Sequence, residues 1–207
     1  QRIHALKMGA NDFINKPFIQ AELAARIKNM LLTQKLYQQV AMQKKALEKM
    51  ALTDQLTGLY NRHFLMPYIK KSLSSAQRYN YPLSLVMMDL DKFKCINDDL
   101  GHGAGDKFLC DIAEILNDNC RSEDAAIRLG GDEFLIVLPH CSLVQAKFKT
   151  ETLKQAVNKL SSSSHQMSAS FGLSSTEGDC FNFEALFSKA DDAAYQSKLK
   201  GGNDISF

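Results

Sequence analysis

Four acidic residues stand in two short clusters, each beside a segment whose composition predicts a β-strand. Asp89 and Asp91 follow an apolar run, and Asp132 and Glu133 follow a pair of glycines. Carboxylates gathered in one place repel each other unless a cation neutralises them, and hard oxygen ligands suit Mg²⁺. If the two segments are neighbours in a sheet, the clusters predict a divalent-ion site. Taken singly, each residue is more often simple turn chemistry, and Asp91 is the one most easily explained as a loop cap.

The glycine pair Gly130-Gly131 stands directly before the second cluster. Glycine adopts positive φ readily and has no side chain, so a phosphate group can approach the backbone closely there. Acidic metal ligands beside such a backbone indicate a site for nucleotide phosphates.

The elements that must position these residues are predicted from periodicity. Beyond residue 51 the order is strand, helix, hairpin, helix, strand, with a helix before them and a helix and edge strand after them. This order is typical of the α+β, ferredoxin-like split βαβ fold, in which the first strand and the hairpin are neighbours. The predicted helices lie at 62–77, after a glycine-rich loop at 101–105, around 153–160 and around 186–194, and the predicted strands at 83–88, 125–129, 133–138, 167–173 and 203–207.

Residues 21–50 contain no Pro or Gly and place apolar residues at three- and four-residue steps. The pattern predicts a long amphipathic helical stalk that pairs with a second copy of the chain. The step from Met30 to Leu36 breaks strict heptad spacing, and Gln43 takes a seam position, so the predicted coiled coil is imperfect. The alternative is a helix that packs on its own domain.

Composition narrows the class of protein. The 207 residues are 45% apolar, which is enough to build a core, and the net charge of +2 argues against a nucleic-acid partner bound through bulk positive charge. The five cysteines form no C-x-x-C pair, so they indicate neither a disulfide framework nor a zinc site and fit a reducing, cytoplasmic compartment. Apolar runs are far shorter than the roughly 20 residues of a spanning helix, so we expect no membrane segment in this chain.

The segment from Arg128 to Phe134, Arg-Leu-Gly-Gly-Asp-Glu-Phe, resembles the signature of the GGDEF family of diguanylate cyclases. The segments at 54–62 and 89–98, and the Gly-His and Gly-Asp pairs at 101–102 and 105–106, resemble further blocks of the same domain. Order and spacing agree over residues 51–207, so this part is identified as a member of the family.

The resemblance implies a Mg²⁺-dependent bacterial signalling enzyme, active as a dimer, that condenses two GTP into cyclic di-GMP and releases pyrophosphate. Mn²⁺ is an alternative ion. Asp89, the Leu90 carbonyl and Asp132 would hold the metal. Asp132 or Glu133 would help to deprotonate the attacking 3′-hydroxyl, and Lys94 would stabilise charge on the phosphate.

For the substrate, Asn97 and Asp106 match the family's base-reading pair, because guanine presents two adjacent N–H donors that one carboxylate can accept. Gly130 and Gly131 would lie at the phosphates, and Lys198 resembles a lysine that holds the triphosphate from the final helix. Four residues after it the family usually has an arginine, where this chain has Gly202. We therefore expect weaker GTP binding, with Lys200 as a partial replacement.

Arg121 and Asp124 stand in the place of an R-x-x-D product-inhibition site of the family. Arg121 would bind a phosphate or guanine of cyclic di-GMP, and Asp124 would accept from a second guanine. A surface ion pair is the alternative. We assign Arg62 and Arg128 to structure, bracing the hairpin and the opening segment of the domain.

The segment from Gly9 to Phe18 resembles the end of a response-regulator receiver domain, so residues 1–32 are expected to be a truncated receiver tail whose last helix overlaps the stalk. In a longer protein, phosphorylation of the receiver would pair two stalks and their cyclase domains. Against the working enzyme stands one alternative of a different class. It is a catalytically weak or inactive module that binds GTP or cyclic di-GMP and regulates a partner. A related enzyme acting on another base is disfavoured by Asn97 and Asp106.

Overall fold

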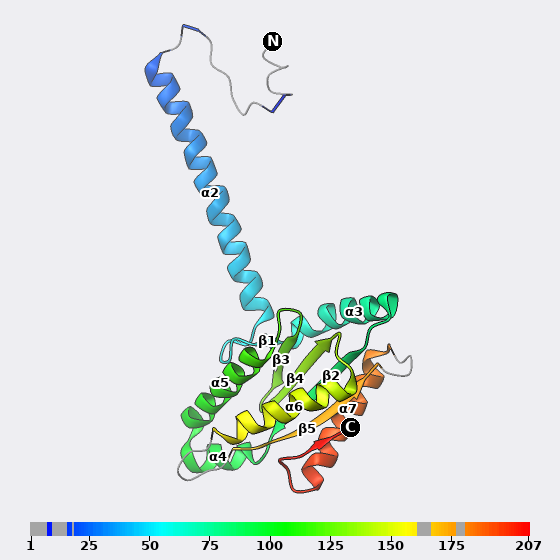
Figure 1. The fold of residues 1–207 in the computed structure, drawn as a ribbon. Coiled ribbons are helices and arrows are strands. Elements are labelled where there is room, and N and C mark those ends of the chain that lie inside the picture. Colours follow the sequence, from blue (N-terminus) through cyan, green and yellow to red (C-terminus); the bar gives the residue numbers. More distant parts are fainter. Residues whose placement is uncertain (1–7, 10–15, 18, 161–166, 177–180) are drawn as a thin grey trace. The chain divides into compact units, whose positions relative to one another are not determined.

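The computed structural model describes residues 8–9, 16–17, 19–160, 167–176 and 181–207 (Figure 1). The chain divides into two compact units, residues 1–49 and 50–207, which are described separately below. Most of the segment that resembles a receiver tail, including residues 1–7, 10–15 and 18, lies outside the described residues, so that prediction stays open.

Most of the described residues of the first unit belong to a single helix. Helix α2 spans Gln20–Leu52, and none of its side chains is buried. The absence of Pro and Gly explains why it continues without a break, and the predicted stalk helix is confirmed as a helix. Its exposed large apolar side chains are Ile27, Met30, Leu31, Leu32, Leu36, Tyr37, Val40, Met42, Leu47 and Met50. Pairing of two such helices stays a prediction.

Six strands of the second unit form one sheet in the order β1-β3-β4-β2-β5-β6 (Figure 1). The strands are β1 Tyr60–Asn61, β2 Leu83–Leu90, β3 Ala125–Gly130, β4 Glu133–Pro139, β5 Ala169–Ser175 and β6 Ile205–Ser206. Within the central group β3-β4-β2-β5 each adjacent pair is antiparallel, while β1 and β6 add parallel strands at the two edges. This is the split βαβ order, so the predicted α+β ferredoxin-like fold is confirmed.

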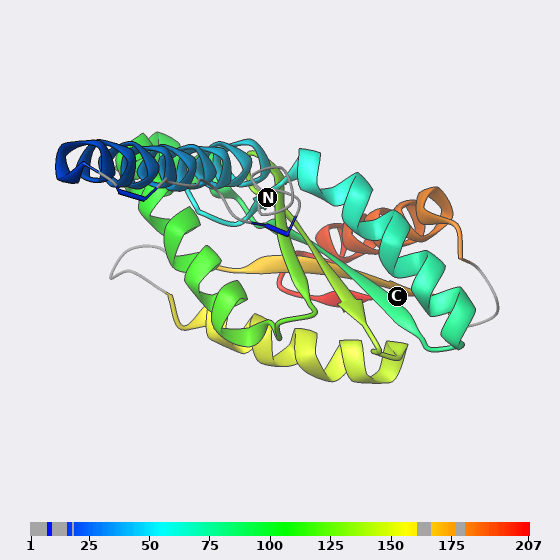
Figure 2. The same cartoon turned by 90° about the horizontal axis from the view of Figure 1, so that it is seen from above.

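Helices cover both faces of the sheet. The helices are α3 Arg62–Tyr79, α4 Phe93–Leu100, α5 His102–Asn119, α6 Leu143–Asn158 and α7 Phe183–Leu199. One apolar core packs α4, α5 and α6 against one face, and a second core packs α3 and α7 against the other. Figure 2 shows α6 along one side of the sheet and α3 along the other.

Strand β2 contributes to both cores, because successive side chains point to opposite faces. Val86 and Met88 belong to the core under α5 and α6, whereas Leu85 and Met87 belong to the core under α3 and α7. Asp89 has the same parity as Met87, so its side chain emerges on the α3 and α7 face. The alternation of side chains along β2 therefore also determines on which face of the sheet Asp89 lies.

The prediction of a glycine-rich loop at 101–105 is wrong. Two helices, α4 and α5, meet at Gly101, whose φ of +83° lets the chain turn between them, and the remaining glycines lie in the first turn of α5. Strand β1 is not predicted from the sequence, because it is only two residues long and carries no periodic signal. In the part of the chain that the structure describes, no helix has both the length and the apolar character needed to cross a bilayer.

Candidate active site

The two acidic clusters meet at one end of the sheet. Asp89 on β2 is the direct cross-strand partner of Glu133 on β4, and the Leu90 amide donates to the Asp132 carbonyl at 3.2 Å. We call Asp89, Leu90, Asp132 and Glu133 the acidic edge. The two clusters lie together because β4, the second strand of the hairpin that carries Asp132 and Glu133, pairs with β2 in the sheet.

Lys198 faces this edge from the last turn of α7. Its Nζ lies 2.6 Å from Asp89 Oδ1, an oxygen that is buried and makes this ion pair without a well-directed hydrogen bond. Burial raises the pKa of Asp89, the nearby Asp132 and Glu133 carboxylates raise it further, and Lys198 opposes both effects; the net direction is upward. A cavity of about 230 Å³ opens here, lined by Met87, Asp89, Glu133, Asp191, Asp192, Ala194, Tyr195 and Lys198.

The acidic edge fits a divalent cation that shares its coordination with a nucleotide. Within the described ranges no three His, Cys, Asp or Glu side chains converge on a ready-made metal position. The edge instead offers three acidic side chains, of which Asp89 and Asp132 are the predicted ligands, and a main-chain carbonyl. Mg²⁺ in proteins is often held by one or two carboxylates together with substrate phosphates. The ammonium group of Lys198 against the buried Asp89 oxygen shows that a cation is favourable at this position.

The turn between β3 and β4 depends on its glycines for backbone geometry. Gly130 and Gly131 have φ values of +150° and +55°, a region that side-chain-bearing residues rarely adopt. A Cβ atom on either would meet nothing within 4 Å. The turn therefore needs glycine for its conformation and leaves open space over the backbone, as a site for phosphates requires.

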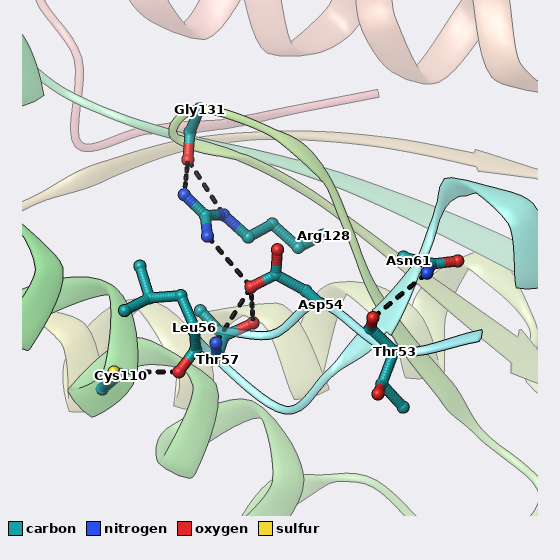
Figure 3. A network of polar contacts seen from close by, with 8 residues as sticks. All are labelled: Thr53, Asp54, Leu56, Thr57, Asn61, Cys110, Arg128 and Gly131. Atoms are coloured by element: carbon teal, nitrogen blue, oxygen red, sulfur yellow. Dashed lines mark hydrogen bonds and ion pairs between the residues drawn. The ribbon is translucent and has the colours of Figure 1, made fainter. Parts of the chain in front are cut away.

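Arg128 clamps this turn to the opening segment of the domain (Figure 3). Its Nε and Nη2 donate to the Gly131 carbonyl at 3.1 and 2.8 Å, and its Nη1 donates to Asp54 Oδ1 at 3.0 Å. The structural role predicted for Arg128 is confirmed. Although burial by itself would raise the pKa of Asp54, hydrogen bonds from Thr57 and the contact with Arg128 outweigh it and lower that pKa.

The opening segment is itself held by Asp54 and Asn61, to which the sequence analysis assigned no separate role. Asp54 Oδ1 accepts from both the amide and the hydroxyl of Thr57. Asn61 caps α3, its Oδ1 accepting from the first amides of that helix, while its Nδ2 donates to the Ala51 and Thr53 carbonyls. The sequence pattern that could identify these two roles is an Asp and an Asn on either side of a turn glycine, directly before a predicted helix.

The predicted guanine-reading residues lie on two adjoining helices, Asn97 on α4 and Asp106 on α5. A Cβ atom at Gly105 would lie 1.9 Å from Asn97 Oδ1, so the Asn97 side chain packs directly against the helix turn that carries Asp106. Asp106 is exposed, and Lys94 is exposed one turn before Asn97 on α4. Gly105 is needed here because any side chain would displace Asn97.

The predicted inhibitory pair lies away from the acidic edge. Asp124 Oδ2 accepts from the Arg121 amide at 2.9 Å and from Lys149 Nζ at 2.5 Å, and its side chain is only 3% exposed, whereas Arg121 is exposed. Both line a cavity of about 600 Å³ beside α6. The carboxylate predicted to accept from guanine is thus already paired with Lys149.

Lys200 and Asp91 have partners outside the acidic edge. Lys200, the expected partial replacement for an arginine at position 202, contacts Ser206 Oγ at 3.0 Å and Asp204 Oδ2 at 3.3 Å. Asp91, grouped with Asp89 from sequence, accepts hydrogen bonds from β5 and from the turn after α7. Neither residue contributes to the acidic edge.

Comparison with known proteins agrees with this geometry. The profile of the family described as "Diguanylate cyclase, GGDEF domain" matches residues 51–204. The response regulator PleD of Caulobacter vibrioides is 32% identical over 98% of this chain and 46% of its own length, and the diguanylate cyclase DgcS of Shewanella oneidensis is 37% identical over 79% of this chain and 55% of its own. The chain thus spans about half the length of these curated relatives.

Among solved structures, the coiled coil and GGDEF domain of DgcB from Caulobacter crescentus, in complex with c-di-GMP, superposes with a TM-score of 0.79 over 89% of this chain and 98% of that one. Its sequence identity of 23% supports the fold alone. The family match covers the acidic edge, the glycine turn and the Asn97–Asp106 pair together. This chain therefore belongs to the GGDEF family of diguanylate cyclase domains.

Proposed function

We propose that this chain is a Mg²⁺-dependent diguanylate cyclase, with Mn²⁺ as an alternative ion, that condenses two GTP into cyclic di-GMP and releases pyrophosphate. The observation that carries the proposal is the cross-strand pair of Asp89 and Glu133, beside the Asp132 backbone and facing Lys198. Membership of the family supports the same reaction.

In this proposal each 3′-hydroxyl attacks the α-phosphate of the other nucleotide, so that an O3′–P bond forms as the bond to the β-phosphate breaks. Asp89, the Leu90 carbonyl and Asp132 would hold the metal, which when bound lowers the pKa of the hydroxyl and offsets charge on the phosphorus oxygens. Asp132 or Glu133 would accept the hydroxyl proton. Lys94, exposed on α4, would stabilise the charge that develops on the phosphate.

Asn97 and Asp106 would select guanine. A carboxylate accepts well from the adjacent N1–H and N2–H of guanine, and adenine lacks that pair of donors. The contact between Asn97 and Gly105 supports this role, because it keeps the two side chains on neighbouring helix turns before any nucleotide binds. Lys198 would bind the triphosphate, close to the open backbone of Gly130 and Gly131.

The proposed active form is a homodimer joined through α2. The product has two-fold symmetry and each half supplies one GTP, so two active sites must face each other. The unburied apolar side chains of α2 support pairing, since a solvated helix of 33 residues gains stability when a partner covers some of them. In a longer, two-component response regulator in the cytoplasm, the state of a receiver domain would control this pairing.

Product inhibition is proposed at the cavity that Arg121 and Asp124 line. Exposed Arg121 would bind a phosphate or guanine of cyclic di-GMP. Asp124 would join only if the ligand displaced Lys149 from it. Arg121 is therefore proposed as the main determinant of inhibition.

One observation favours the alternative, a catalytically weak or inactive module that binds GTP or cyclic di-GMP and regulates a partner. Gly202 supplies no cation where relatives usually have arginine, and Lys200 is paired with Asp204. We keep the enzyme as the main proposal because the acidic edge and the guanine pair are intact.

The test is incubation of the purified chain with GTP and Mg²⁺, with cyclic di-GMP and pyrophosphate measured together at several protein concentrations. The proposal expects both products in a ratio of one cyclic di-GMP to two pyrophosphates, a specific rate that rises with protein concentration, and none from ATP. GTP binding without either product would support the regulatory module instead.

A further inference from the structure

The Asp91 carboxylate is bound on both of its oxygens. Its Oδ2 accepts from Ser168 Oγ at 2.7 Å and from the Asn203 amide at 2.8 Å, and its Oδ1 accepts from Ser170 Oγ at 2.7 Å. Its own amide donates to the Ser168 carbonyl at 2.9 Å. One side chain therefore joins the end of β2, the start of β5 and the turn that follows α7.

Gly202 lies directly over this carboxylate. A Cβ atom built at position 202 would be 2.8 Å from Asp91 Cγ and from both oxygens, and the residue has a φ of +79°. Close approach and positive φ both require glycine. The absence of the family's usual arginine thus has a local explanation, because the turn is folded onto Asp91 and leaves no room for a side chain there. We call Asp91, Ser168, Ser170, Gly202 and Asn203 the clasp.

The turn held by the clasp is continuous with the end of α7. The Gly201 amide donates to the Lys198 carbonyl at 3.0 Å, and the Gly202 amide donates to the Ser197 carbonyl at 3.2 Å. Ser197 Oγ in turn donates to the Phe171 carbonyl of β5 at 2.8 Å. The backbone that carries Lys198 is thereby connected to Asp91 by short, local hydrogen bonds.

We propose that Asp91 is a positioning residue, which acts through the clasp to hold the end of α7 so that Lys198 reaches the acidic edge. Hydrogen bonds to an ionised acceptor are stronger than neutral ones, whereas an unanchored helix end frays. Asp91 follows β2 directly and stands two residues after Asp89, so the end of this strand and the residue beyond it supply the proposed metal ligand and the anchor of the proposed triphosphate lysine. The inference deepens the proposed function and rests on it for the role of Lys198.

The test compares Asp91→Asn with Ser174→Ala. The asparagine has the same size, but it replaces one accepting oxygen with a donor that faces the donors of the clasp. Ser174 is a matched control, because it is another buried β5 serine and its hydroxyl donates to the Leu186 carbonyl on α7, far from Lys198 along that helix. Ser170→Ala, which removes a single donor, is the milder variant if Asp91→Asn does not fold.

Two readouts are needed. Hydrogen–deuterium exchange without nucleotide should show faster exchange over residues 198–203 in Asp91→Asn and wild-type exchange there in Ser174→Ala. Calorimetry with GTP and Mg²⁺ should show binding weakened about tenfold in Asp91→Asn. In rate measurements KM should rise more than kcat falls, because the lost interaction stabilises the bound substrate and the transition state equally. Ser170→Ala should change both readouts in the same direction by less.

The inference is overturned if Asp91→Asn, or Ser170→Ala in its place, leaves exchange over 198–203 at the wild-type rate. It is equally overturned if Asp91→Asn frees that segment while GTP affinity stays at the wild-type value, or if Ser174→Ala weakens GTP as much. Failure of the wild-type chain to bind GTP at all would contradict the proposed function, and the exchange readout would still decide whether the clasp anchors α7.

Discussion

Lys198 Nζ lies 2.6 Å from Asp89 Oδ1, so the proposed triphosphate lysine is paired with the proposed metal ligand. The ammonium group offsets the cost of burying the Asp89 carboxylate, whose pKa is raised by burial. In the proposed function, Lys198 would exchange this carboxylate for a phosphate, and Asp89 would then be available to hold a divalent ion. Metal and nucleotide are expected to bind together more readily than either binds alone.

Replacement of Lys198 by methionine should separate these two roles. Without the competing ammonium, Mn²⁺ should bind the nucleotide-free variant about tenfold more tightly, whereas GTP should bind more weakly because a phosphate contact is lost. Electron paramagnetic resonance of Mn²⁺ and calorimetry of GTP measure the two effects. The control is Lys200→Met, which removes a neighbouring lysine paired with Asp204 and should change neither affinity more than about twofold. Unchanged Mn²⁺ affinity in Lys198→Met would argue against competition at Asp89.

Arg128→Ala should destabilise the domain by about 1–3 kcal/mol, because three hydrogen bonds that join the glycine turn to the opening segment are lost. Chemical denaturation measures the loss. Arg78→Ala, an exposed arginine at the end of α3, is the control and should change stability by less than about 0.5 kcal/mol. Equal stability of the two variants would show that the clamp contributes nothing.

The contact between Asp54 and Arg128 should depend on pH in a defined direction. The pKa of Asp54 is lower in the folded protein than its ordinary value, so its ionisation stabilises the fold above that ordinary value and the effect fades as pH falls through the folded pKa. The free energy of unfolding of wild type minus that of Asp54→Asn should therefore be constant near neutral pH and shrink below about pH 4. A difference that stays constant down to pH 3 would contradict the assignment.

Arg121→Ala should leave the initial rate unchanged and relieve inhibition by accumulated cyclic di-GMP. The reason is that Arg121 lines a cavity beside α6, away from the acidic edge, and presents the exposed cation there. Progress curves with added product measure the effect, and an increase of about tenfold or more in the inhibitory concentration is expected for loss of a bidentate arginine contact. A curve that superposes on that of the wild type would exclude Arg121 from the inhibitory site.

Gly202→Arg should fail to create a phosphate contact, although it places a cation where the family resemblance led us to expect an arginine. The positive φ and the approach to Asp91 predict a loss of about 1–3 kcal/mol of stability. GTP affinity should not improve. Leu199→Arg is the matched control, since it adds the same charge at an exposed helical position without strain. Tighter GTP binding by Gly202→Arg with wild-type stability would contradict the description of the clasp.

The sequence predicts the central sheet well, because each strand of the split βαβ core carries its own signal. The alternation of Met167, Ala169 and Phe171 with small residues identifies β5, and the glycine pair identifies the β3–β4 turn. Helix α4 was missed because its eight residues are too few to show a period and stand next to glycines. Strand β1 is shorter still and is defined by its partner β3.

The sequence predicts which residues lie at the candidate site better than it predicts which of them contact each other. The acidic edge follows from topology, since the hairpin must return beside β2. Three contacts join residues that are distant in sequence. They are those of Asp89 with Lys198, of Asp124 with Lys149, and of Asp91 with Ser168 and Ser170. Only tertiary structure determines which partner each carboxylate has, so Asp91 was placed with Asp89 although it serves the clasp.

Dependence of catalysis on the acidic edge is tested by incubating the wild-type chain and Asp132→Ala separately with GTP and Mg²⁺. Our account predicts cyclic di-GMP and pyrophosphate from the wild type, and at least about a hundredfold less from the variant at unchanged thermal stability, because a proposed metal ligand is lost. Normal turnover by Asp132→Ala would contradict the account, since catalysis would then not depend on the acidic edge.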